Sequence, residues 1–252
     1  MPCRHRFLLT VPARQDQRMD AGDHAPIDPH AEAAVRAVRS GDVAALSVAL
    51  AHQPMLVSGP AAGQRGRSLL HVATDWPGHL TNVAATIAEL VRAGADVEAR
   101  FEGEHAETPL HWAASSDDVE AVTALLDSGA DIDAPGAVIG GGTPLIDATA
   151  YAQWAAARLL VERGAAVSAW DAAALGMTDR VTDLLRDRAV DSLDALLWAA
   201  CHGGHLDTAA LLLAAGADVN WRGWDSLTPL GAAERAGALD VVGWLLECGA
   251  VE

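Results

Sequence analysis

Two aspartates and two other titratable side chains are the residues best suited to chemistry. Asp147 and Asp171 each lie in an alanine-rich stretch of helical character, with Tyr151 and His202 as further titratable groups. Carboxyl groups beside apolar side chains are typical general acids and bases, and aromatic faces stabilise cationic centres. This set would suit acid-initiated cyclisation, isomerisation or hydration of an apolar substrate.

The same residues also have purely structural interpretations. Asp147 and Asp171 could each cap a helix or bond to a local backbone group, and Asp171 follows closely on an expected helix start. His202 stands beside Gly203 and Gly204 at a predicted turn, where a surface histidine is the simpler expectation. At this point both the catalytic and the structural interpretations stay open.

Composition excludes several other chemistries. All 17 basic residues are arginine, so the chain has neither a P-loop lysine nor a lysine for a Schiff base. The three cysteines, Cys3, Cys201 and Cys248, show no CxxC spacing and predict neither a disulfide framework nor a zinc site. No Ser-His-Asp order stands out. We therefore expect no metal and no cofactor.

The net charge of −17 bears on partners and location. Nucleic acids and anionic membranes are bound by clustered basic residues, so neither is expected as a partner. The apolar run near the start, Phe7–Leu9, is too short for a signal peptide, and no stretch reaches the roughly 18 apolar residues of a membrane helix. We expect a cytoplasmic monomer. Arginine without lysine, beside abundant alanine and glycine, is typical of GC-rich bacterial genomes.

The elements that position these residues are predicted by two recurring phrases. Thr-Pro opens a helix, because threonine caps it and proline fits its first position. Leu-Leu closes a second helix, and the following glycine takes the left-handed position. The first phrase occurs at Thr108–His111, Thr143–Ile146 and Thr228–Gly231, and the second, Leu-Leu-x-x-Gly-Ala-Asp-Val, at 90–97, 125–132, 160–167 and 212–219, with variations.

These phrases resemble the ankyrin repeat, down to Gly204–Asp207 between two helices. The resemblance implies an all-α solenoid of about six helix-turn-helix units over residues 31–252, with a degenerate N-terminal cap at 31–52. Residues 1–30 are expected to form a disordered tail. In this register the units begin near Ser68, Thr108, Thr143, Val167, Ala195 and Thr228.

Two spacings depart from the usual ankyrin period. Ser68 and Thr108 are 40 residues apart, which predicts an insertion between helices around Pro77–Thr81. Thr143 and Val167 are only 24 apart, so the hairpin tip between those two units is missing. In the same register Asp147 and Asp171 hold equivalent positions in neighbouring units, where an apolar residue is usual in the family. We therefore expect the two carboxylates to approach each other.

The resemblance also implies where a partner binds. Ankyrin arrays usually bind protein segments at their hairpin tips and on the concave face of their first helices, so a protein-binding module is the first hypothesis and a groove enzyme the alternative. His71 and His111 fill the family's structural histidine position, and Trp170 and Trp198 replace histidine there. These two tryptophans are expected to fill the core more than to contact a ligand. The predicted binding residues are Asp75, Trp76, Trp112, Ser115, Ser116, Trp170, Trp198, Trp221 and Trp224.

Overall fold

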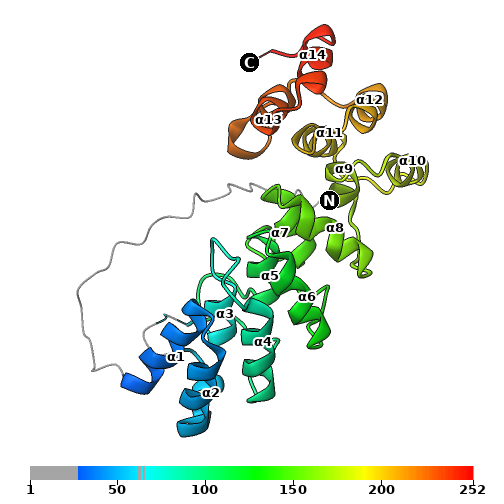
Figure 1. Ribbon diagram of the computed structural model, residues 1–252. Coiled ribbons are helices and arrows are strands. Elements are labelled where there is room, and N and C mark those ends of the chain that lie inside the picture. The colour runs from blue at the N-terminus through cyan, green and yellow to red at the C-terminus, as the bar shows by residue number, and fades with distance from the viewer. Residues whose placement is uncertain (1–27, 62–63, 65, 252) are drawn as a thin grey trace. The chain divides into compact units, whose positions relative to one another are not determined.

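The computed structural model describes residues 28–61, 64 and 66–251, which form α-helices and short 3₁₀ turns (Figure 1). The chain divides into two compact units, whose described parts are residues 28–165 and 166–251. The first helix begins at Pro29, so residues 29 and 30, expected in the tail, are already helical. Residues 1–27 of the predicted tail lie outside the described residues.

The unit of residues 28–165 is a stack of four antiparallel helix pairs. First helices pack on first helices and second helices on second ones, as in α5 on α7 and α6 on α8. Fully buried leucines at one position of the second helices, such as Leu90, Leu125 and Leu160, fill the space between pairs. The pairs are α1 (Pro29–Ser40) with α2 (Val43–His52), α3 (Leu69–Ala73) with α4 (Val83–Arg92), α5 (Pro109–Ala114) with α6 (Val119–Asp127), and α7 (Pro144–Ala150) with α8 (Trp154–Glu162).

The unit of residues 166–251 repeats the arrangement with three pairs. Leu212 and Leu245 continue the buried leucine position, and α11 packs on both α9 and α13. The seven pairs of the described residues confirm the prediction of about six units and a cap. The elements are α9 (Ala169–Ala174) with α10 (Thr178–Arg186), α11 (Leu193–His202) with α12 (Leu206–Ala214), and α13 (Pro229–Ala236) with α14 (Leu239–Glu247), besides the 3₁₀ turns η1 (Pro54–Val57) and η2 (Trp224–Ser226).

The helix starts are capped as the recurring phrases predict. At α5 the Nδ1 atom of His111 accepts hydrogen bonds from the backbone N–H and hydroxyl of Thr108 at 3.1 and 2.9 Å. His71 and Ser68 form the same capping box at α3. The Nε2 atom of His71 then donates to the carbonyl of Glu107 in the next repeat, 3.1 Å away. The histidines therefore join neighbouring repeats, as the resemblance implied.

The predicted insertion lies between α3 and α4. Its backbone is held on both sides, because the N–H of His79 donates to Asp118 Oδ2 at 2.5 Å and the Asn82 amide donates to the Gly41 carbonyl at 3.0 Å. Within it, the N–H of Gly78 donates to the Asp75 carbonyl at 2.8 Å. The insertion is thus a fixed element of the unit of residues 28–165.

Two connections lack a projecting hairpin tip. Residues 163–168 join α8 to α9 directly, as predicted, whereas residues 128–143 between α6 and α7 form a full tip. Residues 187–192, between α10 and α11, form a second short connection that the sequence register did not predict. Beside it, Asp194 Oδ1 accepts from the N–H of Asp218 at 2.7 Å and so ties α11 to the next tip.

Candidate functional site

A chain of aromatic rings crosses the unit of residues 166–251. Trp170 on α9 stacks on Trp198 of α11 with centroids 5.8 Å apart, and Trp224 of η2 contacts both, at 4.1 and 5.0 Å. Trp221 extends the chain from Trp224 at 6.3 Å, and His202 stacks on Trp198 at 5.1 Å. We call these five side chains the tryptophan cluster. It joins three successive repeats, each of which supplies at least one ring.

The side chains of this cluster differ in how far they are exposed. Trp198 and His202 are 3% and 7% exposed, so His202 is a core histidine and the surface interpretation was wrong. Trp170, Trp221 and Trp224 are half-buried, so the two tip tryptophans are less exposed than expected. The cluster therefore consists of two buried rings and three half-buried ones.

The indole N–H groups of the cluster differ in their hydrogen bonding. Trp198 Nε1 donates to the carbonyl of Leu227 at 3.1 Å, directly before the Thr228 cap. This is the bond that His71 makes to Glu107, so Trp198 does replace the structural histidine as predicted. The Nε1 atom of Trp170 is buried and has no hydrogen-bond acceptor among the described residues. A buried donor without an acceptor costs roughly 1–3 kcal/mol.

Charged groups border the cluster at the tip before α13. Arg235 pairs with Asp225 at 2.7 Å, and Arg222 donates to the carbonyl of Ser226 at 3.0 Å. These contacts fix the tip that carries Trp221 and Trp224. The cluster is therefore held in place by both packing and polar bonds.

Asp171 completes the capping box of α9, whose N-cap is Ser168. Its Oδ2 atom accepts from the backbone N–H and the hydroxyl of Ser168 at 3.0 and 2.6 Å, which is the capping box that histidine forms elsewhere. The helix begins one residue later than the register placed it, because Ser168 caps it and not Val167. Asp147 stands four residues after its cap and Asp171 three, but each stands four residues before the C-cap of its own helix, Tyr151 or Leu175. The predicted equivalence of the two positions therefore holds when it is counted from the ends of the helices. The local hydrogen-bonding interpretation of Asp171 is confirmed.

Asp147 lies on α7, in the unit of residues 28–165. Its side chain is fully buried, at 0% exposure, and Tyr151 is the half-buried C-cap of the same helix. Each of the two predicted carboxylates thus belongs to a different unit, and they do not form one site within either unit.

Trp112 is the centre of a second aromatic group in the unit of residues 28–165. It is 7% exposed and lies 4.9 Å from His71 and 5.4 Å from Phe101. The Arg67 guanidinium covers its ring at 5.1 Å, and its Nε1 donates to Glu107 at 3.0 Å. Arg67 and Phe101 were not predicted as part of any site, since neither belongs to a recurring phrase.

The remaining predicted groove residues divide into buried and exposed ones. Ser115 and Ser116, expected on the open groove, are 4% and 6% exposed and belong to the core beside Trp112. Asp75 forms an ion pair with Arg67 at 2.9 Å. The next residue, Trp76, is 64% exposed in the inserted segment. Only Trp76 of this group offers a large apolar surface to a partner.

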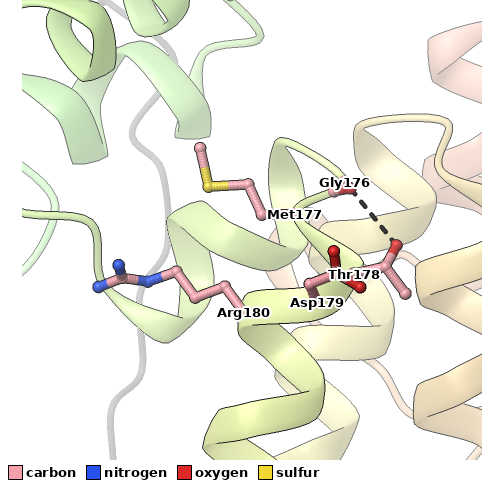
Figure 2. Close-up of a pocket in the computed structure, with 5 residues that line it drawn as sticks. All are labelled: Gly176, Met177, Thr178, Asp179 and Arg180. Atoms are coloured by element: carbon pink, nitrogen blue, oxygen red, sulfur yellow. Dashed lines mark hydrogen bonds between the residues drawn. The ribbon is translucent and has the colours of Figure 1, made fainter.

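A shallow depression opens at the turn between α9 and α10 (Figure 2). It has a volume of about 480 Å³ and is lined by Gly176 to Arg180. The Thr178 hydroxyl bonds to the Gly176 carbonyl at 3.4 Å and to the Thr208 hydroxyl at 2.7 Å. Ligand sites usually gather apolar walls from several elements, whereas one turn lines this depression. It contains none of the predicted site residues.

Catalytic and metal-binding groups are scarce in the part of the chain that the structure describes. No three His, Cys, Asp or Glu side chains there are placed to hold a metal ion. Burial raises the pKa of the Cys201 thiol to about 12, which keeps it protonated and unreactive. Among the described helices, none has both the length and the apolarity needed to span a bilayer.

Comparisons with known proteins agree with this architecture. A family model described as ankyrin repeats in three copies matches residues 82–171 and 169–251. The solved ankyrin repeat domain of human ASB11 is similar in fold, with a TM-score of 0.52 and 23% identity over 87% of this chain and 97% of that one. No curated protein matches the sequence. Ankyrin repeats are in general protein-interaction modules, and this chain belongs to the ankyrin-repeat family.

Proposed function

We propose that the chain is a protein-binding module whose main contact surface is the tryptophan cluster. The observation that carries the proposal is three half-buried tryptophans, Trp170, Trp221 and Trp224, held against the buried Trp198. Tryptophan is enriched among the residues that dominate binding energy, because it covers a large area with little loss of conformational freedom.

The buried N–H of Trp170 supports a peptide ligand. This donor lacks an acceptor in the described residues and is itself buried, so a partner's carbonyl oxygen would reach it once the half-buried rings around it shift. The half-buried rings beside it would cover the apolar side chains on either side of that carbonyl. A segment of extended polypeptide offers both a backbone carbonyl oxygen and apolar side chains on the neighbouring residues.

Trp76 is the second contact of the same function. Its ring is 64% exposed on the inserted segment, which the bonds of His79 and Asn82 hold in place. Because the loop is already ordered, little entropy is lost when the ring enters an apolar pocket of a partner. The two contacts belong to different units and are tested separately.

The test begins with a partner captured from the native cell and identified, whose affinity is then measured by calorimetry. Replacement of Trp221 and Trp224 by alanine is expected to weaken binding about 30-fold or more, since a central tryptophan contributes about 2 kcal/mol or more. Trp154→Ala, on the second helix α8, is the matched control and should leave affinity unchanged. An unaltered affinity in the Trp221, Trp224 and Trp76 variants would refute the proposed surface.

A further inference from the structure

Three carboxylates without an ion pair border the tryptophan cluster. Asp194 lies one helical turn before Trp198 on α11, so the two side chains are on one face of the helix. Asp218 lies three residues before Trp221, and its N–H donates to Asp194 Oδ1 at 2.7 Å. Asp191 is exposed on the short connection before α11. Within the described residues, these three carboxylates have no basic partner.

The basic side chains of the same region do not balance these carboxylates. Residues 187–235 contain seven acidic residues and three arginines. Arg235 pairs with Asp225 at 2.7 Å, Arg222 donates to a backbone carbonyl of its own tip at 3.0 Å, and Arg188 is exposed on the connection before α11. A ligand that covers the half-buried rings is therefore favoured when it brings positive charge to their border.

A segment of this composition lies in the chain before the first repeat. Residues 1–14 include Arg4, Arg6 and Arg14 and no acidic residue, whereas the whole chain has a net charge of −17. The apolar side chains of Phe7–Leu9 follow directly on the first two arginines. Guanidinium groups pair with carboxylates and stack on indole rings. The segment therefore matches the tryptophan cluster both in charge and in apolar character.

We infer that residues 4–9 bind the tryptophan cluster of their own chain. Arg4 and Arg6 pair with the carboxylates at its border, and Phe7–Leu9 cover the half-buried rings. Residues 10–27 span up to about 60 Å when extended, which gives the segment a wide reach from Asp28. Because the segment and the cluster belong to one chain, their effective concentration is high and even a weak contact is populated.

The segment regulates the proposed binding function, because it occupies the same surface as the partner. This consequence rests on the proposed function, whereas the contact itself does not. A partner binds only to the molecules whose cluster is free, so its apparent dissociation constant rises as the free fraction falls. Salt screens the attraction between the arginines and the carboxylates, and the segment should therefore be released as ionic strength rises.

The contact is tested on the full chain with a bimane fluorophore on Cys3, since tryptophan quenches bimane emission at contact distance. Cys248→Ser removes the exposed thiol. Cys201 stays unlabelled, because it is buried and burial raises the pKa of its thiol to about 12. Quenched emission that recovers at high salt is the expected result.

Tryptophan variants locate the contact. Phenylalanine does not quench bimane, so Trp221→Phe combined with Trp224→Phe should abolish the quenching. Trp76→Phe is the matched control, since Trp76 is 64% exposed in the other unit, and it should leave the quenching unchanged. Quenching that depends on Trp76, or that persists in the Trp221 and Trp224 variant, would overturn the inference. Loss of quenching on dilution would also overturn it, because the segment would then lie on another copy.

Charge variants test the match between the segment and the border of the cluster. Arg4→Glu combined with Arg6→Glu should abolish the quenching and leave the helical circular dichroism unchanged, because both positions lie outside the repeats. Arg18→Glu, outside the segment, is the control and should keep the quenching. Asp191→Arg with Asp218→Arg should restore quenching in the Arg4→Glu, Arg6→Glu chain, since the charges are then exchanged. Quenching that ignores the charge at positions 4 and 6 would contradict the contact.

Partner affinity separates this inference from the proposed function. If the segment occupies the cluster about nine-tenths of the time, the Arg4→Glu, Arg6→Glu chain should bind the captured partner about tenfold more tightly. Unquenched wild type, with a partner affinity that still falls in the Trp221 and Trp224 variants, would refute the segment contact and keep the proposed function. Quenching that depends on Trp221 and Trp224, with a partner affinity that does not, would keep the contact and refute the proposed partner surface.

Discussion

The Oδ2 atom of Asp171 accepts hydrogen bonds from both the backbone N–H and the hydroxyl of Ser168, at 3.0 and 2.6 Å. In the inner repeats a histidine does two jobs: its Nδ1 atom accepts at the cap and its Nε2 atom donates to the next repeat. In residues 166–251 two different residues make these hydrogen bonds. Asp171 accepts at the cap of α9, and Trp198 on α11 donates to the next repeat. A residue singled out for acid–base chemistry therefore has a structural duty.

Replacement of Asp171 by alanine should destabilise the unit of residues 166–251 by about 1–2 kcal/mol, because half of the capping box of α9 is lost and the N–H and hydroxyl of Ser168 lose their acceptor. Urea unfolding followed by tryptophan fluorescence measures this. Asp179→Ala, an exposed change on α10, is the control and should alter stability by less than about 0.5 kcal/mol. Equal stability of the two variants would contradict the capping role.

Acid should weaken the unit of residues 28–165 through its buried histidines. Desolvation lowers the pKa of His71 and of His111 to about 4, from an ordinary value of 6.5. The unfolded chain therefore binds protons first as pH falls. Stability is complete above pH 6.5 and declines toward pH 4, by up to about 3 kcal/mol for each histidine.

The measurement for this prediction is the free energy of unfolding in urea at several pH values between 4 and 7. His71→Gln and His111→Gln should each flatten the decline, whatever their effect on stability at neutral pH. Carboxylates also titrate in this range, and the comparison with the wild-type slope removes their contribution. A slope that neither variant changes would disprove the buried neutral histidines.

Trp198→Ala should be the most damaging change in the tryptophan cluster. Its side chain is 3% exposed and carries the bond to Leu227, so a cost of about 3–5 kcal/mol is expected. Trp221→Ala should cost less, because Trp221 is half-buried. Thermal and urea unfolding compare the two, and the order of their effects decides the prediction.

The ion pair of Arg67 and Asp75 should contribute little by itself. Their side chains are 34% and 29% exposed, and pairs open to solvent are typically coupled by about 1 kcal/mol or less. A double-mutant cycle with alanine at both positions, measured at low and high salt, gives the coupling energy. A large coupling that is insensitive to salt would mean that the stacking of Arg67 on Trp112 depends on Asp75.

Much of the fold could be predicted from local sequence, because caps and helix ends depend on neighbouring residues. Thr108 with Pro109, and Gly129 after its leucines, mark element boundaries by their own conformational preferences. The insertion between α3 and α4 and the missing tip at residues 163–168 followed from spacing alone.

The candidate site was harder to predict, because it depends on tertiary packing. A one-residue change in where α9 begins moved Asp171 from the predicted groove to a cap. Trp112 packs against Phe101, which lies outside the repeat phrases, and Ser115 is 4% exposed. The ring contacts of Trp170 with Trp224 join residues far apart in sequence, and no local pattern marks such a pair.

The tryptophan cluster has a further consequence, for spectroscopy. Five of the eight tryptophans lie in residues 166–251, and the chain has a single tyrosine, so ultraviolet emission is weighted toward that unit. The stacked indoles of Trp170 and Trp198 are close enough to share excitation, which should produce a strong near-ultraviolet circular dichroism band. This band offers an intrinsic, label-free signal for the melting of the unit of residues 166–251, whereas the helix signal reports the melting of both units together.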